Sequence, residues 1–424
     1  MKNIFYYLSI SLFLSACFGS KQPTTVQDQN TTTISKEETK TGFTETRQMT
    51  CDFKVLEDGD SLRVYLALFI PRLSKATNTQ AIREELLLNY GVLPDYSSKE
   101  FIDRRKVTLS GNNIHKTGDK YYTSFNVEKR TIISAILYLE ILDSKTSQKT
   151  LTQIPVNYAV TKIREKYGLF NSNGKIPVFS NYILDSDTVQ IRSVANTLEK
   201  FFVKYYAHGF TPASPPMAVS GASNLQKEIE VDSTFTIQTG QNINFKKPGL
   251  YLVLSDTNTY YGLSFYVAER KYPKLSRIKD LIAPLVYITT EDEFNSLKTT
   301  DETKKEMDKL WLKLMSGNVR IAKLTIKEYY NRVKQANQHF TTYKEGWKTD
   351  MGMIFIVYGP PNRVIRTNDS EHWFYTQATS FSEIKFTFSR KPNQFTDNSY
   401  SLIRFPEYEQ VWYPTIELWR EGKI

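Results

Sequence analysis

The sequence predicts a mixed β and α+β fold in which two tandem antiparallel β-sandwich domains precede a C-terminal α+β domain. Strand-length apolar runs separated by turn residues recur between residues 49 and 270, a spacing typical of β-sandwiches. A helical apolar stripe then spans residues 319–340, and more strand-length runs follow it. We expect the folded domains at residues 49–165, 173–272 and 278–424.

Residues 1–16 have the features of a secretory signal peptide. Lys2 supplies a positive charge, and the apolar run Ile4–Leu14 is shorter than the about 20 residues of a membrane-spanning helix. The run ends in Leu14-Ser15-Ala16-Cys17, which resembles the lipobox of bacterial lipoproteins. This resemblance implies lipidation of Cys17, because a thiol can carry a thioether-linked diacylglycerol. Acyl chains such as palmitate contribute about 0.8 kcal/mol per buried CH₂ group and would hold the chain at a membrane.

Residues 17–48 are predicted to be the lipidated cysteine and a flexible tether. The segment is rich in Thr, Gln, Lys and Glu and has almost no large apolar side chains, so it cannot bury enough surface to fold. Phe18 stands where lipoproteins of the inner membrane often carry Asp, which favours the outer membrane. Residues 18–22 contain no acidic side chain, which favours the periplasmic face and leaves surface exposure as the alternative.

Residues 49–165 are predicted to form the first β-sandwich domain. The run Leu62–Ile70 has the length of a strand and stops at Pro71. Ala81–Asn89 fits either a short helix or a strand, because its interior is charged. Further strands are predicted at Lys106–Leu109, Tyr121–Val127 and Ile132–Leu142.

Residues 173–272 are predicted to form a second small antiparallel β-sandwich domain. Pro248-Gly249 is a turn signal that leads into the apolar run Gly249–Leu254. The other predicted strands are Lys175–Phe179, Thr197–Tyr206, Asp232–Ile237, Ile243–Phe245 and Gly262–Val267.

The region 278–424 is predicted to contain both helices and strands. Thr290 with Glu293, and Thr299 with Glu302, fit capping boxes at helix starts, and Gly317 fits a helix C-cap. A long helix should follow, and its apolar stripe should pack against a sheet rather than bind a cofactor. The stripe recurs at steps of three and four residues and consists of Val319, Ala322, Ile326, Tyr329, Val333, Ala336 and Phe340.

A longer motif follows this helix. Gly346-Trp347-x-Thr349-Asp350-x-Gly352 precedes the apolar run Met353–Tyr358, which we predict to be a strand, and then Gly359-Pro360-Pro361. This arrangement resembles the GWxTD-domain family of envelope proteins, best known from Bacteroidetes, whose function is not established. The resemblance covers roughly residues 280–424, and Glu371–Tyr375 and Ile384–Phe388 are further features of the same kind.

Each residue of the motif has a structural explanation that needs no ligand. Gly346 would end the helix with a positive φ, and Trp347 would bury its ring against the helical stripe. Thr349 and Asp350 would bond nearby backbone groups in a turn. Gly352 would allow a close approach at the start of a strand.

The same corner is the candidate binding site. His339 is the strongest acid–base candidate among the four histidines, and Asp350 would orient it. We assign no catalytic residue, because the chain lacks the motifs of serine hydrolases, zinc proteases, P-loop enzymes and dithiol oxidoreductases. The residues of the motif and of the possible binding corner are His339, Gly346, Trp347, Thr349, Asp350, Gly352, Tyr358, Gly359, Pro361 and Arg363.

Composition narrows the classes of ligand. The formal charge is +10, but the basic residues are spread along the chain, so we expect no nucleic-acid partner. With Cys17 lipidated, Cys51 is the second cysteine, and we interpret it as a buried structural thiol. We expect no cofactor and no metal, since Asp185-x-Asp187 lacks the glycine and distal glutamate of a calcium loop.

The leading hypothesis is a non-enzymatic lipoprotein anchored in the outer membrane. It would present its domains to an unidentified envelope protein during assembly, secretion or maintenance of a surface complex, and would contact the membrane through its lipid. The alternative is an envelope enzyme or glycan-binding module that uses the corner from Trp347 to Asp350. If exposed, Trp373, Trp412 and Trp419 would stack on sugars in such a module, but packing in a core is the favoured interpretation of these three residues. A third possibility is a structural spacer between membrane and cell wall.

Overall fold

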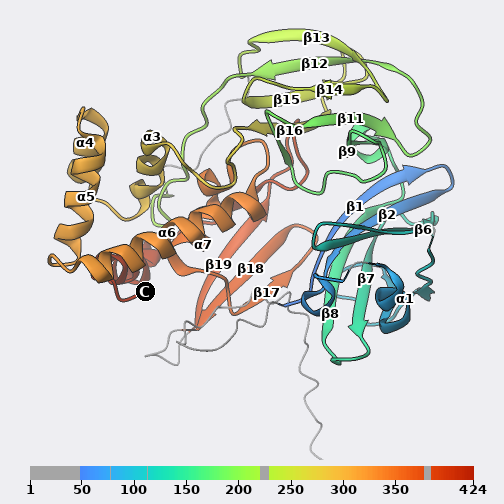
Figure 1. Ribbon diagram of the computed structural model, residues 1–424, viewed down its shortest axis with the longest axis horizontal. Coiled ribbons are helices and arrows are strands. Elements are labelled where there is room, and N and C mark those ends of the chain that lie inside the picture. Colours follow the sequence, from blue (N-terminus) through green and yellow to red (C-terminus); the bar gives the residue numbers. More distant parts are fainter. Residues whose placement is uncertain (1–47, 77, 112, 220–228, 377–382) are drawn as a thin grey trace, which may run out of the picture.

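The computed structural model describes residues 48–76, 78–111, 113–219, 229–376 and 383–424. Strands, mainly in antiparallel sheets, make up more of this chain than helices do, and the longer helices come after residue 277 (Figure 1). The predicted signal peptide, Cys17 and the tether lie outside the described residues. None of the helices described is both long and apolar enough to cross a bilayer.

Two four-stranded antiparallel sheets, β1-β2-β6-β5 and β4-β3-β7-β8, share one apolar core. Buried side chains alternate along β2, as in Val64 and Leu66, and along β7, as in Leu137 and Leu139. The undecided segment Ala81–Asn89 contains the end of a helix followed by a strand. The elements are β1 (Thr50–Asp58), β2 (Ser61–Phe69), α1 (Gln80–Glu85), β3 (Leu86–Leu93), β4 (Asp103–Val107), β5 (Ile114–Thr117), β6 (Lys120–Glu128), β7 (Ser134–Asp143) and β8 (Lys149–Asn157).

The short helix α2 (Ile163–Lys166) leads to two further sheets, β14-β11-β9 and β10-β16-β15-β12-β13. These sheets share a second core. We predicted purely antiparallel sheets, but β10 pairs with β16 in parallel, so for the second sheet this prediction is wrong. Lys175–Phe179 forms no strand, since only an isolated bridge joins Pro177, which has no N–H group, to Phe170. The strands are β9 (Tyr167–Asn171), β10 (Tyr182–Leu184), β11 (Thr188–Ser193), β12 (Lys200–Tyr206), β13 (Ser233–Gln238), β14 (Asn242–Asn244), β15 (Gly249–Leu254) and β16 (Leu263–Ala268).

Strand β15 is buried on both faces. Tyr251 and Val253 belong to the core shared with β14-β11-β9. Leu250, Leu252 and Leu254 face the other way, into a smaller cluster that includes Tyr343 and Phe395. The strand therefore packs directly on the C-terminal region, which explains why it is apolar throughout rather than alternating.

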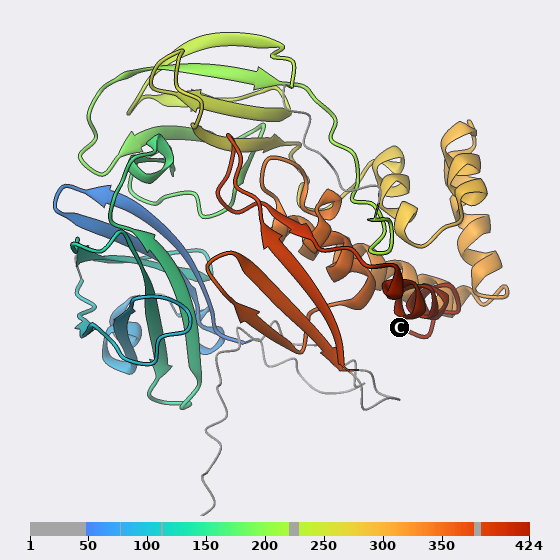
Figure 2. The same ribbon diagram turned by 180° about the vertical axis from the view of Figure 1, so that it is seen from behind.

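The C-terminal region places helices on one side of an antiparallel sheet, β17-β18-β19-β20, as Figures 1 and 2 show from opposite sides. The ring of Phe340 at the end of α6 lies 5.5 Å from that of Trp373 in β18. The elements are α3 (Ile278–Ile282), α4 (Glu291–Thr299), α5 (Thr303–Leu314), α6 (Val319–Phe340), α7 (Asp350–Tyr358), β17 (Arg363–Arg366), β18 (Ser370–Thr376), β19 (Glu383–Arg390), β20 (Tyr400–Leu402) and α8 (Glu409–Arg420).

The helix starts agree only in part with the predictions. Thr290 and Glu293 form the expected capping box of α4. The second predicted box is wrong, because Thr299 is the last residue of α4 and Glu302 precedes α5 without a capping side-chain bond. Most of the predicted stripe of α6 is buried, but Val319, in the first turn, is exposed.

The apolar run Met353–Tyr358 is helical, so the predicted strand is wrong. It belongs to α7, in which every residue from Met351 to Val357 is buried. A helix buried all round has no apolar periodicity, and a short apolar run does not distinguish a buried helix from a buried strand. Tertiary burial and a capped N-terminus outweigh the strand preference of its β-branched residues here.

Candidate functional site

The motif forms the corner between α6 and α7. The chain leaves α6 at Phe340, makes a single 3₁₀ turn at Gly346–Lys348 and enters α7 at Asp350. Gly346 does not have a positive φ, contrary to the prediction. A Cβ atom at this position would lie 2.0 Å from the carbonyl oxygen of Ala336. Glycine is therefore required here, because the backbone of the 3₁₀ turn touches the backbone of α6.

Two buried polar side chains at the end of α6 form hydrogen bonds with the backbone of the 3₁₀ turn. Asn337 accepts a hydrogen bond from the Trp347 N–H at 3.0 Å and donates one to the carbonyl of Pro273, also at 3.0 Å. The hydroxyl of Thr341 accepts from the Gly346 N–H at 3.0 Å. Side chains therefore satisfy the first two backbone N–H groups of the 3₁₀ turn, and the third, of Lys348, donates to the carbonyl of Glu345.

Trp347 is buried, as predicted. Its carbonyl accepts a hydrogen bond of 2.9 Å from the hydroxyl of Tyr287, and the two rings meet edge to face with centroids 6.2 Å apart. The indole therefore packs inside the core of the C-terminal region and offers no face to a ligand.

Thr349 is the N-cap of α7. Its hydroxyl accepts from the Gly352 N–H at 3.0 Å and donates to the carbonyl of Gly346 at 2.7 Å. A Cβ atom on Gly352 would lie 1.9 Å from that same carbonyl oxygen. The predicted close approach at Gly352 is present, but it occurs in the first turn of a helix rather than at a strand start.

Asp350 bonds distant groups rather than the local turn that we predicted. Its Oδ2 accepts from the Leu402 N–H at 2.9 Å, and its Oδ1 lies 2.5 Å from Nη2 of Arg404. The two side chains are 11% and 6% exposed, so the ion pair is almost fully buried. The same guanidinium also donates to the carbonyls of Ser214 and Pro215.

The residues at this corner, in their order along the chain, are those of one domain family. Residues 249–421 match the GWxTD domain family. The chain carries a GWxTD domain. The match begins inside β15, earlier than the resemblance near residue 280, in agreement with the packing of β15 on Tyr343 and Phe395. No sequence among the curated proteins matches the chain.

The remaining candidates around the GWxTD corner do not converge on a pocket. His339 is exposed at the end of α6, and no contact in the described parts of the chain joins it to Asp350. The Tyr358 ring packs on Phe386 at 5.0 Å. Arg363 lies in β17, paired with Glu383 at 3.0 Å.

The chain leaves α7 through Gly359 and the two prolines of the motif. Gly359 is the C-cap with a φ of 81°, and Pro361 is buried. Neither residue exposes a polar group that the corner would need to bind a ligand. Among the residues that the structure describes, the candidates at the GWxTD corner form no acid–base pair.

Trp373, Trp412 and Trp419 are buried, in agreement with the favoured core-packing interpretation and against stacking on sugars. Trp373, Trp412 and Trp419 all lie in the core of the GWxTD domain. The indole N–H of Trp419 donates to the carbonyl of Val357 at 2.9 Å, and that of Trp373 donates to Glu371 at 3.1 Å. Their rings serve core packing.

Cys51 lies half-buried in β1 without a disulfide partner. Burial, with the charge of Asp52 beside it, raises the pKa of the thiol, so the reactive thiolate is disfavoured. No cluster of three or more His, Cys, Asp or Glu side chains suited to a metal occurs among the described residues.

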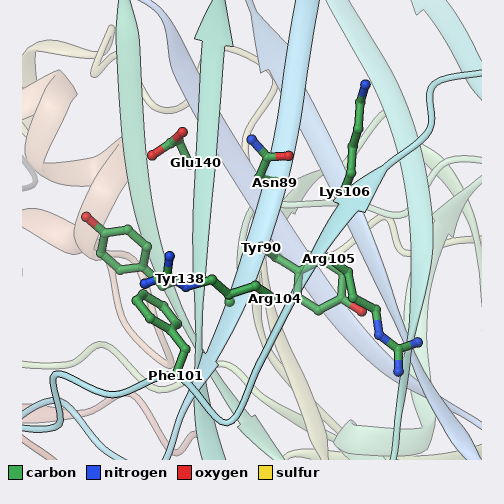
Figure 3. Close-up of a pocket in the computed structure, with 9 residues that line it drawn as sticks. Asn89, Tyr90, Phe101, Arg104, Arg105, Lys106, Tyr138 and Glu140 are labelled. Carbon is green, nitrogen blue, oxygen red and sulfur yellow. The ribbon is translucent and has the colours of Figure 1, made fainter.

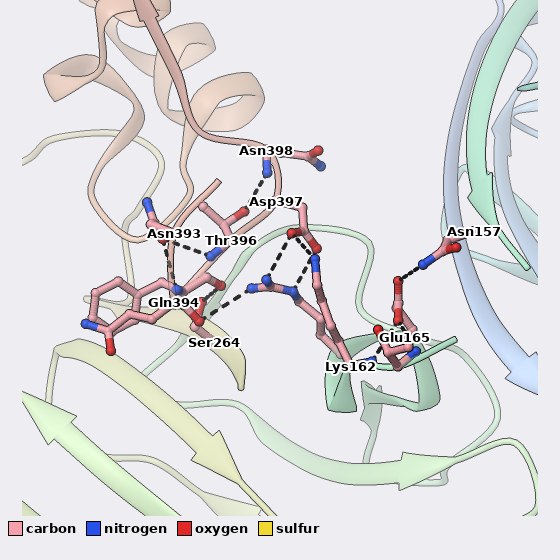
Figure 4. Close-up of polar contacts among 12 residues, drawn as sticks. Asn157, Lys162, Glu165, Ser264, Asn393, Gln394, Thr396, Asp397 and Asn398 are labelled. Atoms are coloured by element: carbon pink, nitrogen blue, oxygen red, sulfur yellow. Dashed lines mark hydrogen bonds and ion pairs between the residues drawn. The ribbon is translucent and has the colours of Figure 1, made fainter. Parts of the chain in front are cut away.

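The loop between β19 and β20 joins the C-terminal region to helix α2 and to strand β16 (Figure 4). The carboxylate of Asp397 lies 2.6 Å from Nζ of Lys162 and 2.8 Å from Nε of Arg164, at helix α2. Two residues earlier, the carbonyl of Phe395 accepts a 2.6 Å hydrogen bond from Ser264 in β16. Within α2, Glu165 accepts from Asn157 at the end of β8.

This loop therefore contacts the segment that connects the first and second pairs of sheets, and the last strand of the second pair. We call Lys162, Arg164, Ser264, Phe395 and Asp397 the junction. The prediction from sequence missed the junction, as it missed Asn337 and Arg404, because no local pattern marks a residue whose partner is distant in the chain.

Proposed function

We propose that this protein is a non-enzymatic lipoprotein of the outer membrane that presents two tandem β-sandwich domains and a GWxTD domain to protein partners. The process served would be assembly, secretion or maintenance of a surface complex in the cell envelope. Enzymatic chemistry at the GWxTD corner gains no support from the geometry, and neither does glycan binding there.

The burial of Asp350 against Arg404 is the observation that carries the non-enzymatic proposal. A general acid or base needs a protonatable group within reach of substrate. Here the carboxylate is neutralised by a guanidinium and accepts a backbone N–H, and both side chains are almost fully removed from solvent. The motif's polar groups stabilise the corner and leave none free for chemistry.

The junction supports a presenting role. Asp397 holds two cationic side chains at α2, and Phe395 inserts its ring beside Tyr206 in the cluster under β15. Such contacts resist hinge motion between the β-sheets and the GWxTD domain. A body of this kind suits the display of a fixed surface more than a cycle of opening and closing.

The anchor follows from the sequence alone. A diacylglyceryl group on Cys17 and the polar segment 18–48 would hold the folded body at a distance from the membrane. Phe18 favours the outer membrane, and the lack of acidic residues after it favours the periplasmic face, as argued above.

Large apolar side chains are exposed near the C-terminus. Ile403 and Phe405 precede α8, and Tyr413 and Leu418 lie on α8 itself. Single exposed apolar side chains are common, but protein interfaces are enriched in aromatic residues, and here one exposed ring, Phe405, lies just before α8 and another, Tyr413, lies on it. We propose this α8 surface as the place where a partner docks.

Crosslinking in intact cells, followed by affinity purification, tests the proposal. The wild-type protein should be recovered with one envelope protein in near-equal amount. Tyr413→Glu should reduce that recovery by about fivefold or more, the effect of losing roughly 1 kcal/mol at an interface. The control is Tyr260→Glu, which places the same charge at an exposed tyrosine remote from α8 in the sequence.

Two outcomes would contradict the proposal. Repeated recovery of the protein without any partner would favour the spacer hypothesis, above all if deletion left envelope composition and permeability unchanged. Equal loss of the partner in both variants would mean that α8 is not the docking surface.

A further inference from the structure

A pocket of about 450 Å³ lies on the outer face of the sheet β4-β3-β7-β8, far in sequence from the GWxTD corner (Figure 3). Strand register places two rows of side chains across it. Arg104, Gly91 and Tyr138 are paired across β4, β3 and β7 in one row. Lys106, Asn89 and Glu140 form the next row. The volume falls within the about 300–1,000 Å³ typical of small-ligand sites.

Gly91 allows an aromatic ring to lie on the strand. A Cβ atom at this position would come within 2.2 Å of Cδ1 of Phe101, so any larger residue would displace the ring. Cζ of Arg104 lies 4.1 Å from the centre of the Phe101 ring, and the Tyr138 ring meets Phe101 edge to face at 5.8 Å. Figure 3 shows these three side chains gathered at one end of the pocket.

This stacking orients a guanidinium that has no acidic partner. In the described chain no ion pair or hydrogen bond involves the side chain of Arg104 or of Lys106, whereas the neighbouring Arg105 pairs with both Asp103 and Glu128. A guanidinium held against a ring keeps its N–H fork free for a planar oxyanion, and little side-chain entropy remains to be lost on binding. The positive charge of Arg104, unpaired among the described residues, would attract a carboxylate at this end of the pocket.

The second row favours hydroxyl groups over further anions. Asn89 supplies both a donor and an acceptor at an exposed position. One oxygen of Glu140 lies 2.5 Å from Lys149, and its carboxylate remains an acceptor that repels a second anionic group. A polyphosphate or nucleic acid is therefore disfavoured, while a sugar hydroxyl can donate to Glu140.

We propose that this face binds a carbohydrate that carries a carboxylate, such as a uronic-acid oligosaccharide. Its carboxylate pairs with Arg104, its ring lies against Tyr138, and its hydroxyls bond Asn89 and Glu140. The site is separate from the α8 surface and does not depend on the partner-binding role, so it adds a glycan contact to the envelope protein. Unlike the hypothesis of sugar binding at the GWxTD corner, it uses side chains that solvent reaches.

Calorimetric titration of the purified folded chain tests the proposal with three probes: a uronic-acid oligosaccharide, its neutral counterpart and inorganic phosphate. The uronic-acid probe should bind at least about tenfold more tightly than either of the others, since a charge-assisted hydrogen bond contributes roughly 1.5–3 kcal/mol. Equal binding of the neutral probe, equal binding of phosphate, or no binding of the uronic acid would each overturn it.

Variants locate the site. Arg104→Gln should weaken the uronic-acid complex by about tenfold or more, and Arg104→Lys should restore only part of the loss, because an ammonium lacks the planar fork. Arg320→Gln, which removes the same charge from an exposed position on α6, should leave the affinity unchanged. Thermal unfolding should confirm that all variants fold, and an equal loss in Arg320→Gln would place the binding elsewhere.

Discussion

The aspartate of the GWxTD motif is held by an arginine that lies 54 residues further along the chain: Oδ1 of Asp350 is 2.5 Å from Nη2 of Arg404. This pair links the first turn of α7 to the segment after β20, and through the carbonyls of Ser214 and Pro215 to a loop that precedes β13. The motif thereby joins three parts of the fold.

The glycine of the motif should be indispensable for stability. Gly346→Ala places a methyl group 2.0 Å from the Ala336 carbonyl oxygen in α6, where backbone cannot move aside. We expect a loss of about 3 kcal/mol or more in the free energy of unfolding, measured by denaturant titration. Gly111→Ala is the control, with Nη1 of Arg83 at 3.4 Å as its nearest neighbour, and should change stability by no more than about 0.5 kcal/mol. Equal effects would refute the backbone-contact explanation.

One buried lysine should make a contribution to stability that rises with pH above about pH 8. Burial lowers the pKa of Lys344 to about 8, against the opposing effect of nearby Asp350, whereas an unfolded lysine titrates near about 10.4. Between these two pKa values the lysine binds more protons in the unfolded state than in the folded state, so its contribution to the free energy of unfolding increases with pH, by at most about 1.4 kcal/mol per pH unit.

Denaturant titrations between about pH 7.5 and 8.5, where unfolded tyrosines are still almost fully protonated, check this prediction. Lys344→Met should abolish the lysine's share of the slope. Lys334→Met, an exposed control on α6, should retain the wild-type slope. Identical slopes in all three proteins would show that Lys344 does not titrate as described.

Removing the junction carboxylate should loosen the contact between α2 and the GWxTD domain. Asp397→Asn loses the pairs with Lys162 and Arg164, which are partly screened by solvent, so we expect a modest loss of about 1 kcal/mol. Hydrogen exchange should accelerate in α2 and in the loop between β19 and β20. Asp369→Asn, at an exposed carboxylate, is the control, and unchanged exchange in α2 would argue against the junction.

The lipid anchor depends on one thiol. Cys17→Ala should move the protein from the membrane fraction to the soluble fraction and abolish labelling with a fatty-acid analogue, since the acyl chains supply the membrane affinity. Cys51→Ala keeps the lipobox and should remain in the membrane fraction, labelled. Labelling that persists in Cys17→Ala would contradict the lipobox assignment.

The sequence predicted best where a local pattern specifies a local structure. Turn residues around apolar runs located most strands, the stripe from Ala322 to Ala336 located α6, and the capping pair Thr290 and Glu293 located α4. The GWxTD match was also visible, because its residues are close together in the chain.

The failures share a physical cause. Nothing local to Met353–Tyr358 distinguishes a helix buried on all sides from a buried strand, and the core around α7 decides between them. The roles of Asn337, Arg404 and Asp397 depend on partners that only the fold brings close. His339 and Asp350 looked like a dyad because they are near in sequence, yet Asp350 pairs with Arg404 instead.

A double-mutant cycle on Asp350 and Arg404 tests most directly the claim that the motif aspartate serves the fold. Asp350→Asn leaves a buried guanidinium uncompensated and should lower the free energy of unfolding by about 3–5 kcal/mol. The exposed pair of Arg363 and Glu383 is the reference and should contribute less than about 1 kcal/mol. We predict a coupling energy of about 2 kcal/mol or more between Asp350 and Arg404 in urea titrations of the two single variants and the double variant. A coupling near zero, with Asp350→Asn as stable as the wild type, would contradict the account and return the aspartate to the list of functional candidates.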